Sequence, residues 1–90
     1  MAHPSELRRG SILELEQFVD STQVSDWRLD ASRGKGLSLG GYAPGARFEV
    51  VEPRLDRGAF QGRAMIKFLG SDPPIHFGVS DSDLRLFRVA

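Results

Sequence analysis

The sequence predicts an all-β domain, a small six-stranded antiparallel barrel. Its 90 residues are enough for a single domain. Short segments in which apolar and polar residues alternate recur about every 8 to 12 residues, a spacing typical of small barrels and sandwiches. Ten glycines and five prolines interrupt these segments, as turns between strands require. Closure into a barrel would remove the unpaired edges that such strands otherwise present.

Gly10 separates a polar start from the first regular segment. We expect residues 1–10 to form a flexible basic leader and residues 11–90 to form the single β-barrel domain. Residues 11–20 fit two structures. As a strand, Leu13, Leu15 and Val19 would face the core, and as a helix, Ser11 would begin a capping box. The strand is favoured because strand-like segments follow, and an N-terminal helix stays as the alternative.

The remaining strands are predicted from alternating residues between glycine and proline stops. The longest alternation places Phe60, Ala64, Ile66 and Phe68 on one face. Because most phenylalanines fall on such inward faces, we expect them in the core rather than stacked on nucleic-acid bases. The predicted strand segments after the first are residues 27–31, 46–52, 58–70, 75–79 and 83–89, and residues 36–41 add a short apolar pair after the glycine turn.

Composition excludes several classes of protein. Twelve basic residues balance 12 acidic ones, so no long-range field would hold duplex DNA. The chain has no cysteine and therefore no disulfide or thiolate nucleophile. No apolar run approaches the roughly 18 residues that a membrane span needs. We expect a cytoplasmic protein without a membrane segment.

The familiar catalytic and phosphate motifs do not fit. Gly36, Ser38 and Gly40 have the form of a hydrolase nucleophile elbow, but turn and strand follow them where that elbow needs a helix. A Walker A loop would need a glycine where Leu29 stands. No acid, base and nucleophile can be placed together, and the two histidines have no metal-binding spacing. We therefore expect neither an enzyme nor a metal site.

The stretch "LDASRGKGLSL", followed by "PGARFEVVE" and "GRAMIKFL", resembles the PilZ family of small bacterial β-barrels, many of which bind cyclic di-GMP. The family motif is D/N-x-S-x-x-G. Asp30 and Ser32 match its first two positions, while Lys35 occupies the glycine position between Gly34 and Gly36. The match therefore needs a shift of one residue.

The resemblance implies a cytoplasmic signalling module that is not an enzyme, has no cofactor, and takes cyclic di-GMP as its candidate ligand. A carboxylate at Asp30 would accept hydrogen bonds from a guanine edge. The family also has R-x-x-x-R before its first strand, whereas Arg8 and Arg9 are adjacent here. The candidate ligand-binding residues are Arg8, Arg9, Asp30, Ser32, Arg33, Gly34 and Gly36.

The alternative is an SH3-like barrel acting as a protein-interaction or regulatory module without nucleotide. Gly58, Gly62 and Ile66 resemble the glycine-rich loop of KOW modules. In this alternative an exposed apolar patch is expected around Tyr42, Leu55 or Phe87. Both interpretations include a protein partner, and a homodimer is compatible with a barrel whose edge is interrupted.

Overall fold

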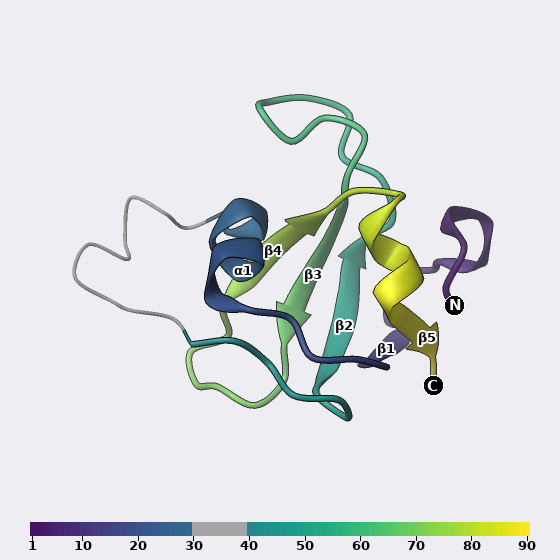
Figure 1. The fold of residues 1–90 in the computed structure, drawn as a ribbon. Coiled ribbons are helices and arrows are strands. Elements are labelled where there is room, and N and C mark those ends of the chain that lie inside the picture. Colours follow the sequence, from purple (N-terminus) through teal and green to yellow (C-terminus); the bar gives the residue numbers. More distant parts are fainter. Residues whose placement is uncertain (30–39) are drawn as a thin grey trace.

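A single antiparallel sheet dominates the computed structural model, which describes residues 1–29 and 40–90. Five strands lie in the order β4-β3-β2-β1-β5, with helix α1 on the β4 side and the N-terminal segment on the β5 side (Figure 1). The elements are η1 (Pro4–Glu6), β1 (Ile12–Leu15), α1 (Ser21–Trp27), β2 (Arg47–Glu52), β3 (Ala64–Phe68), β4 (His76–Val79), η2 (Asp83–Leu86) and β5 (Phe87–Val89). The prediction of a small, mostly antiparallel β domain is confirmed.

The register of the sheet follows the alternation in the sequence. Phe48 pairs with Phe68, and Val50 pairs with Ile66. Because directly opposite residues lie on the same face of an antiparallel pair, these side chains gather on the core side. The pairing shifts between Val50 and Glu52, so that Glu52 lies opposite Met65. Because of this irregularity, Glu52 is the neighbour of Met65 on the outer face of the sheet.

Within residues 11–20, the segment Ile12–Leu15 forms a strand and not a helix. Leu13, Leu15 and Val19 are buried as the strand pattern predicts, while Phe18 is 65% exposed. Val19 continues the extended segment through an isolated bridge to Tyr42.

The predicted strand at residues 27–31 is wrong over its described part, because Trp27 ends helix α1. The carboxylate of Asp20 accepts a hydrogen bond from the backbone N–H of Gln23 and so caps the helix start. Val24 and Trp27 lie three residues apart on one helical face, and both are buried. Only Arg28 keeps strand character, in an isolated bridge to Phe77 of β4.

Trp27 lies between the two outer strands of the sheet. Its ring centroid is 5.7 Å from that of Phe87 in β5, and its Nε1–H donates to Asp83 Oδ2 at 2.8 Å. Its neighbour Arg28 reaches β4. The described residues thus form five strands instead of the expected six, and the end of α1 contacts both outer strands through Trp27 and Arg28. Most of the apolar pair segment at 36–41 lies outside the described residues.

Residues 1–10, expected to be a flexible leader, lie against the sheet. Ala2 and Leu7 are each 2% exposed, and the backbone N–H of Ala2 donates to the carbonyl of Phe87. The N-terminal ammonium is 2.9 Å from Glu16 Oε1, and the N–H of Gly10 donates to the Val50 carbonyl.

Aromatic side chains fill the core. Phe48, Phe77 and Phe87 are fully buried, and the ring of Tyr42 contacts Phe48 with centroids 5.5 Å apart. Assignment of these phenylalanines to the core is confirmed. Since Phe87 is fully buried and Tyr42 half-buried, these two residues do not form the exposed apolar patch expected in the protein-interaction alternative.

Candidate functional site

A pocket of about 290 Å³ lies on the outer face of β3. Met65 lines it and alternates along β3 with the buried residues Ala64 and Ile66, so it faces away from the core. The loop that joins β2 to β3 forms one wall, and the residues that follow α1 form another. The lining residues are Arg28, Leu29, Leu55, Arg57, Gly58, Ala59, Phe60 and Met65.

The β2–β3 loop is held in place by its own backbone. The N–H of Leu55 donates to the Arg63 carbonyl, and the N–H of Gly62 donates to the Leu55 carbonyl, both at 2.8 Å. Gly58 and Gly62 have φ angles of +89° and +88°, a region that favours glycine. The glycines compared above with a KOW loop therefore shape the wall of the pocket.

Phe60 forms the aromatic part of this wall and lies on the backbone of β4. A Cβ atom at Gly78 would lie 2.6 Å from Phe60 Cδ2, so only glycine leaves room for the ring there. The guanidinium carbon of Arg63 is 4.5 Å from the centroid of the same ring. The wall thus depends on a residue of β4 and on Arg63.

Arg28 is the half-buried cation of the pocket. Its Nε is buried and has no hydrogen-bond partner among the described residues. Burial raises the pKa of the Tyr42 phenol, and the positive charge of Arg28 opposes that rise. A buried donor without a partner is costly, and Arg28 is one of the two arginines that line the pocket.

Neither Arg8 nor Arg9 lines the pocket, but Arg9 pairs with Glu52, which lies opposite Met65 of the lining. Arg9 Nη2 contacts Glu52 Oε2 at 2.7 Å, and this pairing raises the pKa of Arg9. Glu52 is the partner of Met65 across the β2–β3 pair, where side chains on one face are about 5 Å apart at Cβ. Arg8 donates instead to the carbonyls of Ser5 and Leu7, at 3.1 and 3.0 Å.

The other candidate residues, Asp30, Ser32, Arg33, Gly34 and Gly36, lie outside the described residues. Leu29, which directly precedes Asp30, lines the pocket, and its N–H donates to the His76 carbonyl at 3.3 Å.

Sequence reasoning missed the pocket itself. In the sequence, Phe60 stands out only by its place in an alternating pattern, and Leu55 only as part of the exposed apolar patch of the alternative interpretation. The glycines at 58 and 62 were the available signal, since closely spaced glycines in a strand-like segment indicate a turn.

Within residues 1–29 and 40–90, no group of three or more histidine, aspartate or glutamate side chains is placed to hold a metal ion. No helix of this part of the chain is long and apolar enough to cross a membrane. No protein-family model matches the chain, and no curated protein or solved structure shows significant similarity to it.

Proposed function

We propose that the chain is a non-enzymatic, PilZ-like binding module that takes cyclic di-GMP at the outer-face pocket and regulates a protein partner. One observation carries the proposal. Leu29, next to Asp30 in the sequence, lines the pocket, and Arg9 pairs with Glu52, the cross-strand partner of Met65 in the pocket lining. Leu29 directly precedes the acidic motif in the sequence and Arg9 belongs to the basic N-terminal segment, and these two relations support the assignment of the ligand to this pocket.

The chemistry of the pocket supports this ligand class. Leu55, Phe60 and Met65 offer apolar and aromatic surface to a planar base. Arg28 and Arg57 supply guanidinium groups, which suit phosphate oxygens and also stack on bases. A volume of about 290 Å³ is near the lower end of ligand pockets, so it suits one base, with the rest of the ligand along the rim.

The same proposal includes the finer fold assignment. The five strands and the segment around Trp27 would together make a PilZ-like barrel, in which Trp27 spans the outer strands in place of a sixth strand. An SH3-like barrel stays the nearest alternative.

The test is isothermal titration of cyclic di-GMP into the wild-type chain and the variants Arg28→Gln and Arg54→Gln. Arg54 is an exposed arginine outside the pocket lining, so it controls for a general loss of charge. The Arg28→Gln variant loses one charged hydrogen bond to the ligand, so its affinity for cyclic di-GMP should fall at least about tenfold. The affinity of the Arg54→Gln variant should change less than about twofold. Absence of binding by the wild-type chain, or equal losses in both variants, would refute the proposal.

One observation favours the alternative, a protein-interaction module without nucleotide. Arg9 already has an anionic partner in Glu52, so an incoming phosphate would have to compete for it. In that case the wild-type chain would give no titration heat and no change in melting temperature with cyclic di-GMP.

A further inference from the structure

We infer that Arg63 is the positioning residue of the pocket, because it holds the Phe60 wall in place without lining the pocket itself. The inference rests on the proposed function only for the identity of the ligand. It assigns a role to a side chain that no motif in the sequence singles out.

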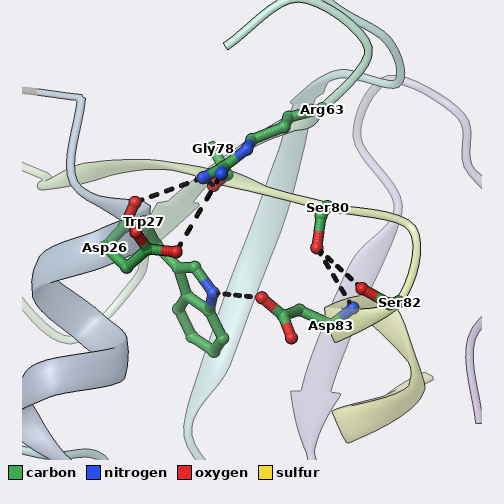
Figure 2. Close-up of polar contacts among 7 residues, drawn as sticks. All are labelled: Asp26, Trp27, Arg63, Gly78, Ser80, Ser82 and Asp83. Carbon is green, nitrogen blue, oxygen red and sulfur yellow. Dashed lines mark hydrogen bonds and ion pairs between the residues drawn. The ribbon is translucent and has the colours of Figure 1, made fainter.

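Arg63 joins three parts of the fold. Its Nη1 donates to the carbonyl of Asp26 near the end of α1 and to the carbonyl of Gly78 in β4, both at 3.2 Å. Its Nη2 is 3.9 Å from Asp26 Oδ2. Figure 2 shows the guanidinium between these two residues. The Arg63 side chain is 26% exposed, so these contacts are partly shielded from water.

Phe60 is held between Arg63 and the sheet. The guanidinium covers its ring at 4.5 Å, and the ring packs against Gly78, where a side chain would collide with it. The backbone N–H of Arg63 also donates to the Phe60 carbonyl at 3.0 Å. The arginine thus fixes both the ring and the turn that carries it.

Arginine is required at position 63 because one side chain must both stack on the Phe60 ring and donate hydrogen bonds to two carbonyls. A planar guanidinium can stack on a ring and donate in its own plane to two carbonyls at the same time. A lysine ammonium keeps the charge but has no plane to stack with. Loss of Arg63 would therefore release Phe60 from Gly78, and the pocket would lose its aromatic wall while Arg28 and Arg57 stay in place.

A double-mutant cycle tests this role. Arg63→Gln should weaken cyclic di-GMP binding about fivefold, the value of a ring contact, and Arg63→Lys should recover only part of that loss. In the Phe60→Leu background, Arg63→Gln should change affinity less than about twofold, since the ring through which it acts is gone. Equal losses in both backgrounds would overturn the inference but leave the proposed function standing.

A second measurement needs no ligand. The wild-type chain should give a nuclear Overhauser contact between Phe60 ring protons and the Gly78 α protons. This contact should be lost in Arg63→Gln and kept in Arg57→Gln, a control at a pocket residue whose side chain is 92% exposed. If it persists in Arg63→Gln, the inference is refuted whether or not cyclic di-GMP binds. If wild-type binding is absent but the contact behaves as expected, only the proposed function fails.

Discussion

Gly41→Ala should destabilise the protein strongly, whereas Gly40→Ala should not. A Cβ atom at Gly41 would overlap the carbonyl oxygen of Val19 and would lie 2.8 Å from Phe18 Cζ and 3.2 Å from Asp20 Cα. A Cβ at Gly40 would meet nothing within 4 Å. The first clash is with backbone, so a change of side-chain rotamer does not relieve it.

The magnitude follows from what must move. Val19 and Tyr42 exchange two backbone hydrogen bonds, each of 3.0 Å, directly beside Gly41. Separating the two segments weakens both bonds, worth about 1 kcal/mol each, and overpacking adds about 1–3 kcal/mol. We expect a loss of about 2–4 kcal/mol, a large part of the roughly 5–13 kcal/mol typical of 90 residues.

Urea unfolding followed by far-ultraviolet circular dichroism measures both variants. Alanine also lowers the entropy of the unfolded chain, by about 0.4–1 kcal/mol, but this acts alike at both positions and cancels in their difference. If Gly41→Ala were within about 0.5 kcal/mol of Gly40→Ala, the packing argument would be wrong.

Three further predictions concern α1, its attachment and the sheet. Trp27→Phe should cost about 2–4 kcal/mol in urea unfolding, since a fully buried side chain loses part of its volume and its hydrogen bond to Asp83. Asp20→Ala should cost about 1 kcal/mol, the usual value of a helix N-cap, in the same assay. The hydrogen bond from Arg88 lowers the pKa of Glu14 below 4.5, with a smaller electrostatic contribution from Arg47. The ionised Glu14 carboxylate therefore stabilises the folded state above pH 4.5, and this contribution is lost as the pH falls through the lowered pKa. The difference in urea midpoint between wild type and Glu14→Gln should therefore shrink from about pH 6 to about pH 3.

Each of these predictions has a matched control. Asp83→Asn keeps an acceptor for Trp27, so it should cost less than Trp27→Phe, and a larger cost would contradict the assigned packing role. Asp56→Ala, at a carboxylate 88% exposed, should change stability much less than Asp20→Ala. A midpoint difference for Glu14→Gln that is independent of pH would contradict the pairing with Arg88.

The glycine run at residues 40–41 shows how a sequence pattern can mislead about function. Its first member, Gly40, ends the G-x-S-x-G form of a hydrolase nucleophile elbow. In the structure, Gly41 is required by the close approach of Val19, and Gly40 has open space around it. Glycine is thus required at position 41 but not at position 40, and only the packing of the distant segment around Val19 distinguishes the two positions.

The sequence alone determined the strands at Arg47–Glu52, Ala64–Phe68 and His76–Val79, because a period of two in a chain with one buried face specifies both the strand and its inward side chains. The predicted strand at 58–70 was wrong over residues 58–63, which form a turn that carries Phe60 onto the outer face. Helix α1 was missed because seven residues hold only two turns, too few for a helical period to appear. The tertiary structure alone decided the pocket. A shift in register placed Glu52, the ion-pair partner of Arg9, opposite Met65, and a folded-back loop placed Phe60 over Gly78. These contacts join residues too far apart in sequence for any local pattern to record.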